Sequence, residues 1–302
     1  MSDRSEAPYR LANRSVLFSA LKAFSVPETR AASLRCFSKA FRNFFLFQFK
    51  AALFPGRIPV RSVDHPLDGD IPFEPGRIAV YLDFVPFWIR AVGYLMDHFG
   101  RDTHKEAAAF IDSMGELYTY AARVYGQNLS TTRRPRYLAR PRFLLIHAAD
   151  PHLLCVPSLH VMVVVRAYTH FRDILRRMEK ETGQKVPWAE SMEEELRNGA
   201  LEITETILFV KQHSVNCIPA ALYAMTSFDR NLFGPEEAEA FVGDLFAKPG
   251  TIPETTGEAI REHIKSLYRR LLAEGEAASD WTQPILAFLS EQPLSSNRSR
   301  NY

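Results

Sequence analysis

Paired cysteines, an excess of charge of one sign and long uncharged apolar runs are all scarce in this sequence. The 302 residues include three cysteines, whose wide spacing matches no zinc-binding pattern, so we expect reduced thiols in a cytoplasmic protein. The formal net charge of +2 argues against a global basic field for nucleic acid. The longest uncharged runs, residues 151–165 and 212–228, are shorter than the roughly 18 residues of a membrane span.

Strand-like alternation, internal repeats and low-complexity tracts are also missing, whereas helical patterns cover most of the chain. A hydrophobic content of 46% is sufficient for a core. We therefore predict an all-α helical bundle. Its expected parts are N-terminal helices and a surface loop over residues 1–76, a helical core over residues 77–228, and C-terminal helices over residues 229–302 that pack on the core.

Two apolar stretches could be mistaken for membrane or export signals. A helix is expected over residues 77–99, but Asp83, Arg90 and Asp97 would each cost roughly 2.5–3.5 kcal/mol near a bilayer centre, which favours a buried helix. Near the N-terminus, residues 16–21 are followed by Lys22 and by no cleavage site of small residues, so a signal peptide is not indicated.

Cations and phenylalanines alternate at helical spacing over residues 30–53. Such a helix can lie on an anionic membrane surface, with the rings in the lipid and the cations at the headgroups. The alternative is that the phenylalanines belong to the core and the cations form a solvated face, and this alternative is the favoured one. The sequence leaves both interpretations open.

The segment Pro157-Ser158-Leu159-His160 opens a long apolar run. This pattern is typical of a helix N-terminus, where a Ser caps free backbone N–H groups. With His160 in the first turn, the segment predicts an anion site beside a proton donor. An ordinary capped core helix with a buried histidine is the alternative.

Two further segments carry candidate chemistry. The run Lys211-Gln212-His213 lies in a second helical pattern, and a helix continuing through it would place Thr206, His213 and Cys217 on one face. Upstream of both motifs, a Pro-containing loop carries five arginines that require anionic partners. The partner is a bound phosphate group if the loop belongs to the site. If the loop is a surface patch instead, the partners are lipid headgroups or nucleic acid. The five arginines are Arg133, Arg134, Arg136, Arg140 and Arg142.

The order of these three segments resembles the type 2 phosphatidic acid phosphatase and vanadium haloperoxidase superfamily, and the spellings Pro-Ser-Leu-His and Lys-Gln-His are most similar to its inositol phosphorylceramide synthase-like branch. Arg133, separated by six residues from Arg140-Pro141, stands for the Lys of the first signature. The resemblance covers roughly residues 77–228. It implies a helical bundle that binds phosphate without a metal or another cofactor.

The resemblance also implies roles for individual residues. His213 would be the nucleophile that forms a phosphohistidine, and His160 would protonate the leaving oxygen. The sequence departs from the family at two places, because Ile207 replaces an arginine and Cys217 replaces the Asp that orients the nucleophile; Asn216 could supply a carbonyl oxygen instead. The implied phosphate-binding groups are Arg133, Arg140, Ser158, the Leu159 amide, Lys211 and Thr206.

The expected function is phosphoester hydrolysis or phosphoryl transfer on a phosphorylated lipid or a small phosphomonoester. Three alternatives stay open: an inactive relative that binds a phosphorylated lipid or other anion, a peripheral protein on an anionic membrane surface, and a metal protein. Nucleic acid is not an expected partner. The metal alternative would use His147, His152, His160 and His213.

Overall fold

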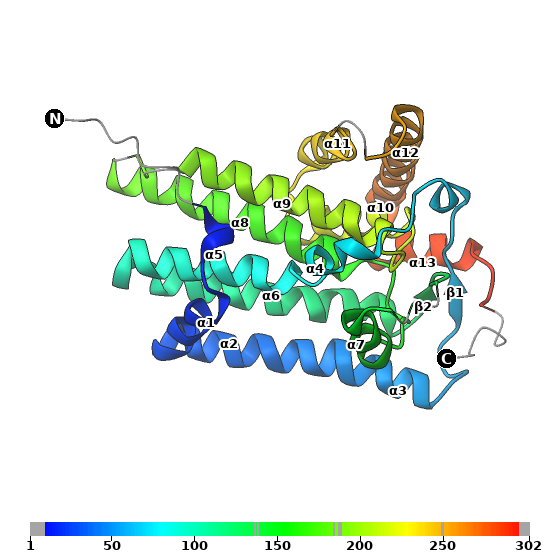
Figure 1. The fold of residues 1–302 in the computed structure, drawn as a ribbon, viewed down its shortest axis with the longest axis horizontal. Coiled ribbons are helices and arrows are strands. Elements are labelled where there is room, and N and C mark those ends of the chain that lie inside the picture. Colours follow the sequence, from blue (N-terminus) through cyan, green and yellow to red (C-terminus); the bar gives the residue numbers. More distant parts are fainter. Residues whose placement is uncertain are drawn as a thin grey trace.

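The computed structural model describes residues 10–135, 137, 139–183, 185–186, 189–248 and 251–295, and it shows an all-α protein (Figure 1). The predicted fold class is therefore confirmed. The elements of the first half of the chain are α1 (Val16–Ser25), α2 (Pro27–Ala40), the π-helical segment η2 (Phe41–Leu46), α3 (Phe47–Leu53), β1 (Val60–Ser62), α4 (Ile78–Tyr81), α5 (Phe84–His98), α6 (His104–Tyr125) and β2 (Leu129–Thr131).

The second half of the chain is helical throughout its described elements. These are α7 (Pro141–Ala149), α8 (Leu159–Thr182), α9 (Ala189–Phe209), α10 (Cys217–Phe228), α11 (Pro235–Asp244), α12 (Glu254–Ala277) and α13 (Thr282–Glu291). Residues 187 and 188, directly before α9, lie outside the described part.

The long helices form layers in Figure 1, with α8 and α9 in the upper part, α5 and α6 in the middle, and α1, α2 and α3 in the lower part. Helix α8 lies at the centre of the packing, because it contacts α5, α6, α9 and α10. Every residue from Leu154 to Phe171 is buried. Gly115 allows α2 to approach α6 closely, since a Cβ at this position would lie 2.9 Å from the Cα of Cys36.

Strands β1 and β2 were not predicted, and they matter for the site. They pair in parallel, with Val60 opposite Leu129, and Leu154 bridges to Ser130 beside them. The Ser130 hydroxyl also accepts a hydrogen bond of 2.7 Å from the backbone N–H of Val156. Three residues per strand are too few to produce a readable alternation, yet they hold the segment that leads into α8.

Two predicted helices are interrupted, and a proline accompanies each break. The helix expected over residues 77–99 is divided at Leu82 and Asp83 into α4 and α5, and the helix expected to continue through Cys217 ends at Phe209. Pro86 and Pro219 each occupy the third position of the helix that follows the break. A proline is tolerated in a first turn, where its missing N–H has no intrahelical partner to lose, but not in a helix interior.

Within the described residues, one stretch, Pro75–His98, is long and apolar enough to cross a membrane. It comprises the short 3-10 turn at residues 75–77 together with α4 and α5. Inside the protein, 44% of its most apolar window is buried, and α5 packs against α1, α6 and α8. The core helix of a folded protein passes the same test of length and composition, so this stretch is weak support for a span.

Candidate functional site

Two histidines from the predicted motifs face each other across a small cavity. The ring centroids of His160 and His213 are 5.4 Å apart, with the planes inclined at 68°. The cavity has a volume of about 20 Å³, which is room for about one water molecule. Its lining residues are Phe44, Tyr81, Asp150, His152, Leu154, Cys155, Leu159, His160 and His213.

His160 is positioned by the start of α8. Ser158 has extended backbone angles and caps the helix as predicted, with its hydroxyl accepting from the Val161 N–H at 3.5 Å. The imidazole lies between two aromatic rings, with centroid distances of 4.4 Å to Tyr81 and 4.1 Å to Phe84. These contacts hold the ring in one orientation at the cavity.

His213 is positioned by a chain reversal rather than by a helix. Lys211 has a left-handed backbone with φ 54°, and the N–H groups of Gln212 and His213 both return to the carbonyl of Ile207. The predicted common helical face of Thr206, His213 and Cys217 is therefore wrong, because α9 ends at Phe209 and Cys217 begins α10.

Burial makes both imidazoles neutral at pH 7. It lowers the pKa of His213 to about 4 and that of His160 well below its usual value, and the neighbouring His213 lowers the pKa of His160 further. The His213 ring also donates a hydrogen bond to the Cys155 carbonyl. Within the described part of the chain, Nδ1 of His213 and Nε2 of His160 are buried without a hydrogen-bond partner.

Arg134 supplies the cation of the site, although the sequence did not single it out among the arginines. Its guanidinium donates to Oε1 of Gln212 at 3.2 Å and to the carbonyl of Asp150 at 3.3 Å. Its positive charge lowers the pKa of His213 and of His152. The spacing in the first signature favoured its neighbours, so no sequence signal distinguished Arg134.

Asp150 and His152 are two further cavity residues that sequence reasoning did not assign to the phosphate site. Burial raises the pKa of the Asp150 carboxyl, and this carboxylate accepts from the backbone N–H of His152 at 2.8 Å. Nε2 of His152 lies 2.8 Å from the Thr132 hydroxyl, and burial lowers the pKa of this histidine well below its usual value. His152 has a left-handed backbone with φ 58°, a conformation that residues other than glycine adopt at a cost and mostly at functional positions.

Three of the predicted phosphate-binding cations do not reach the cavity. The Arg133 side chain is 94% exposed and lies 3.9 Å from Asp64, and Arg140 is exposed at the start of α7. Nζ of Lys211 donates to two backbone carbonyls in the loop before α4, those of Asp68 and Ile71. Arg136 lies outside the described residues.

The two candidates for orienting His213 are occupied elsewhere. The amide of Asn216 donates to the Val63 carbonyl at 3.1 Å, and its oxygen accepts from Nε2 of His263 at 2.8 Å. Cys217 is a fully buried free thiol whose pKa burial raises well above its usual value. The Thr206 hydroxyl is buried and, within the described ranges, lacks a partner.

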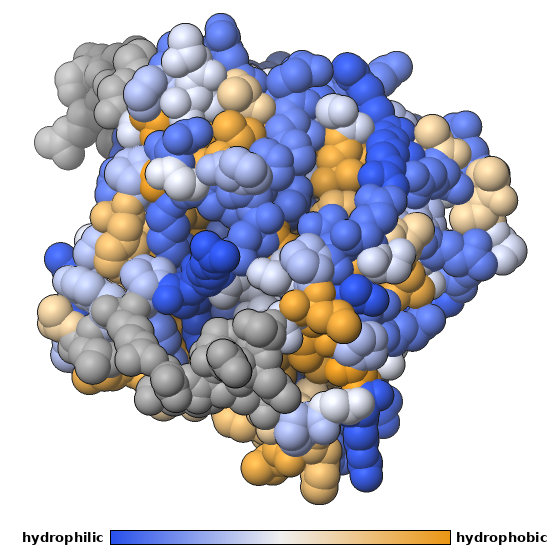
Figure 2. Space-filling model, turned by 90° about the vertical axis from the view of Figure 1, so that its right-hand side faces the viewer, coloured by the Kyte–Doolittle hydropathy of each residue, from blue (hydrophilic) through white to orange (hydrophobic). Residues whose placement is uncertain are grey.

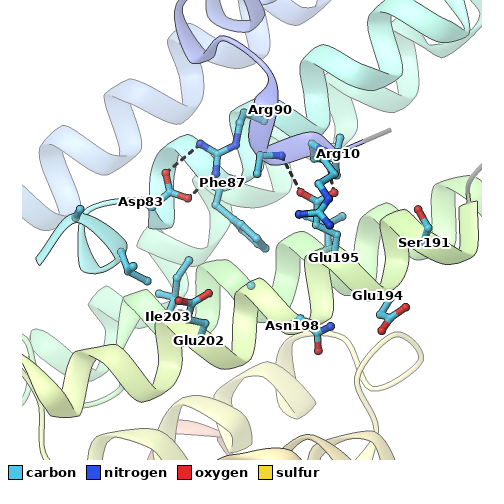
Figure 3. Close-up of a pocket in the computed structure, with 16 residues that line it drawn as sticks. Arg10, Asp83, Phe87, Arg90, Ser191, Glu194, Glu195, Asn198, Glu202 and Ile203 are labelled. Carbon is cyan, nitrogen blue, oxygen red and sulfur yellow. Dashed lines mark hydrogen bonds and ion pairs between the residues drawn. The ribbon is translucent and has the colours of Figure 1, made fainter. Parts of the chain in front are cut away.

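A larger cavity, about 670 Å³, lies between α5, α9 and the N-terminal segment (Figure 3). Three of its charged side chains have partners within the protein. Asp83 pairs with Arg90, and Glu195 accepts from the backbone N–H groups of Leu11 and Ala12. Among the residues the structure describes, no group of three or more His, Cys, Asp and Glu side chains is arranged to hold a metal ion.

The chain matches no protein-family model, no curated protein and no solved structure. The resemblance to the phosphatidic acid phosphatase superfamily therefore rests on the sequence motifs alone.

Proposed function

We propose that the protein is a phosphoester hydrolase or phosphoryl-group transferase that acts on a phosphorylated lipid or small phosphomonoester through a phosphohistidine at His213. The observation that carries the proposal is the pair of buried imidazoles, 5.4 Å apart, each with a ring nitrogen that lacks a partner within the described residues. Unpartnered buried polar atoms are costly, and they accumulate at functional sites.

The neutral His213 supports the role of nucleophile. A pKa of about 4 keeps the imidazole neutral, with a ring-nitrogen lone pair available at neutral pH, and Nδ1 is buried without a partner among the described residues. Attack by Nδ1 forms the N–P bond while the P–O bond to the leaving alcohol breaks. Arg134, which donates to the carbonyl of the cavity residue Asp150, would neutralise charge on the phosphoryl oxygens, which is where most of the barrier lowering in phosphoryl transfer arises.

His160 would serve as the acid of the first step and the base of the second. In the empty site it is neutral, but a bound phosphate dianion favours the imidazolium and raises the pKa of this histidine. The imidazolium gives its proton to the leaving alkoxide. It then takes a proton from water or from a second alcohol, whose oxygen attacks phosphorus as the N–P bond breaks and His213 is released.

Trapping of the phosphoenzyme tests this mechanism. The wild-type protein is mixed with a radiolabelled phosphomonoester and quenched in alkali, in which phosphohistidine is stable, and a second aliquot is treated with acid, which removes the label. We expect acid-labile label on the wild type and on His104→Gln, a control on α6, and none on His213→Gln. Unchanged turnover in His213→Gln would assign the activity to another site.

Binding without turnover is the second candidate function, and two observations favour it. The cavity of about 20 Å³ admits a phosphate only if its lining side chains move, and no carboxylate takes the place of the orienting Asp among the described contacts of His213. Such a protein would bind orthovanadate or inorganic phosphate yet release no phosphate from monoesters. Calorimetry with both anions, run beside the turnover assay, separates the two functions.

A further inference from the structure

Helices α2 and α3 and the segment η2 between them carry a row of exposed, large apolar side chains. The row follows intervals of three or four residues, which places it along one side of a single helical rod. Most of the opposite side of α2 packs on α6 and buries residues such as Ala32 and Cys36. The members of the row are Leu34, Phe37, Phe41, Phe45, Phe49 and Leu53, with exposed fractions of 40–73%.

Neighbouring elements extend this apolar surface. On α1, the exposed apolar residues are Leu17, Phe18, Leu21 and Phe24, and on α7 they are Leu144 and Leu145. In Figure 1 the helices α1, α2 and α3 form the lower side of the molecule, and Figure 2 shows hydrophobic side chains gathered at the lower edge, at the end where α3 lies. A contiguous apolar face of this kind marks an interaction site.

The charges on the segments that form this face are mainly positive. Residues 29–63 contain seven Lys or Arg and no Asp or Glu, and residues 117–149 contain six Arg and no Asp or Glu. On α2, Arg35 and Lys39 pair with acidic residues of α6, but Arg42 and Lys50 form no ion pair within the described residues. The guanidinium of Arg57 lies 4.9 Å from the Phe54 ring centroid, at the end of the rod.

We propose that this face, the apolar side of α1, α2, η2, α3 and α7, docks on a bilayer that contains anionic lipid. An amphipathic helix lying in the interface plane has this composition, with Phe and Leu in the acyl boundary and Lys and Arg at the headgroups. Each cation near an anionic surface adds attraction. A second copy of the chain fits the face poorly, because a symmetric dimer through it would bring the same uncompensated cations together.

The docking face is continuous with the histidine cavity. Phe44 of η2 lines the cavity, while its ring packs edge-to-face against Phe45, which is 42% exposed on the docking face. Asp150, the residue that follows α7, lines the same cavity. A lipid headgroup held at the face would therefore lie next to Phe44. The docking proposal itself uses no property of the histidines and does not depend on their chemistry.

Co-sedimentation with vesicles tests the proposal on the full chain. We expect the wild type to bind vesicles of phosphatidylcholine with phosphatidylglycerol more tightly than vesicles of phosphatidylcholine alone, and to lose this preference in high salt. The triple variant Phe37→Ser, Phe41→Ser, Phe45→Ser should bind more than about tenfold more weakly, since burying even one phenylalanine contributes at least a factor of this size. Leu294→Ser is the matched control, because Leu294 is 64% exposed outside the docking face and its removal should change nothing.

A charge pair completes the experiment. Arg42→Gln with Lys50→Gln should weaken binding to the anionic vesicles, whereas Arg230→Gln with Lys248→Gln, at exposed sites outside the docking face, should not. Circular dichroism of each variant confirms its folding. Absence of wild-type binding to anionic vesicles overturns the proposal, and so does a wild-type dimer that the phenylalanine variant dissociates, since the face would then be covered by a second copy.

Discussion

The imidazoles of His160 and His213 meet edge to face at 5.4 Å, although one starts a helix and the other lies in a turn 53 residues later. The groups that hold the two rings do not belong to the predicted motifs' titratable side chains; they are aromatic rings and a backbone carbonyl. Aromatic rings hold His160, and a backbone carbonyl holds His213. The pair is thus oriented without the carboxylate that the resembled family uses.

Arg134 should be the cation that sets the anion affinity of the site. Arg134→Gln removes the charge beside the cavity, and we expect the affinity for orthovanadate to fall about tenfold to a hundredfold, since a hydrogen bond to a charged group contributes about 1.5–3 kcal/mol. Arg133→Gln is the matched control, because that side chain is 94% exposed. Isothermal calorimetry measures both. Equal losses in the two variants would mean that the anion binds on the arginine loop rather than in the cavity.

The stability of the protein should fall as the pH is lowered from 7 to 5. His213 has a pKa of about 4 when folded against 6.5 for an unperturbed histidine, so the unfolded chain binds the proton first. The contribution of neutral His213 to the free energy of unfolding is complete above pH 6.5. It is lost as the pH falls toward 4, at about 1.4 kcal/mol per pH unit in that window. His160 acts in the same direction, whereas the raised pKa of Asp150 opposes it once the pH falls below that raised pKa.

Urea unfolding of the wild type and of His213→Asn at pH 7, 6 and 5 measures this dependence. In the variant, the free energy of unfolding should change less per pH unit, because one histidine that resists protonation has been removed. An unchanged slope would show that His213 is protonated as readily in the folded protein as in the unfolded chain.

Cys217→Asp, which restores the residue type of the resembled family, should destabilise the protein without activating it. The position is fully buried, and the nearby carboxylates of Asp64 and Asp68 already raise the pKa of the thiol by their charge. An ionised Asp in these surroundings costs several kcal/mol. Thermal unfolding and turnover are measured on Cys217→Asp and on the neutral control Cys217→Ser. A tenfold gain in turnover by the Asp variant, equivalent to about 1.4 kcal/mol, would show instead that a carboxylate here can reach His213.

Gln48→Met should stabilise the protein. Gln48 is fully buried in α3, and neither its amide nitrogen nor its oxygen has a hydrogen-bond partner among the described residues. A methionine of similar shape avoids the cost of burying an unsatisfied amide, which is about 1–3 kcal/mol. Denaturant unfolding measures the change, with the exposed Gln127→Met as control. A loss of stability would indicate that a buried water satisfies the amide.

The fold class and the start of α8 could be predicted from the sequence because they depend on local rules. Helical periodicity fixed the elements, and the Pro-Ser pair marked the helix start that the Ser158 cap confirms. The breaks before α5 and α10 also follow a local rule, because a proline is tolerated in the first turn of a helix but not in its interior. Pro86 and Pro219 therefore indicate both breaks in the sequence. The interpretation of the phenylalanines in residues 30–53 as core residues is confirmed only in part. Phe44 and Phe47 pack on the core. The exposed phenylalanines are Phe37, Phe41, Phe45 and Phe49.

The remainder of the site could not be predicted, because it depends on contacts between distant segments. The choice of Arg134 over Arg133 and Arg140 follows from the pairing of β1 with β2 and from the contacts with Gln212 and Asp150. The bond between the His213 ring and the Cys155 carbonyl joins two loops that no periodicity relates. A spacing rule between motif residues cannot report such a contact.

The π-helical turn of η2 sets the angular phase between α2 and α3. An α-helix advances about 100° per residue, and a π-helical turn accommodates one residue more than an α-helical turn does. If η2 kept its six residues but became α-helical, α3 would rotate by about that angle relative to α2. Gln48 would leave its buried position, and the apolar row would divide into two rows that point in different directions. The single extra residue thus keeps six apolar side chains in line along a rod whose other side stays fitted to α6.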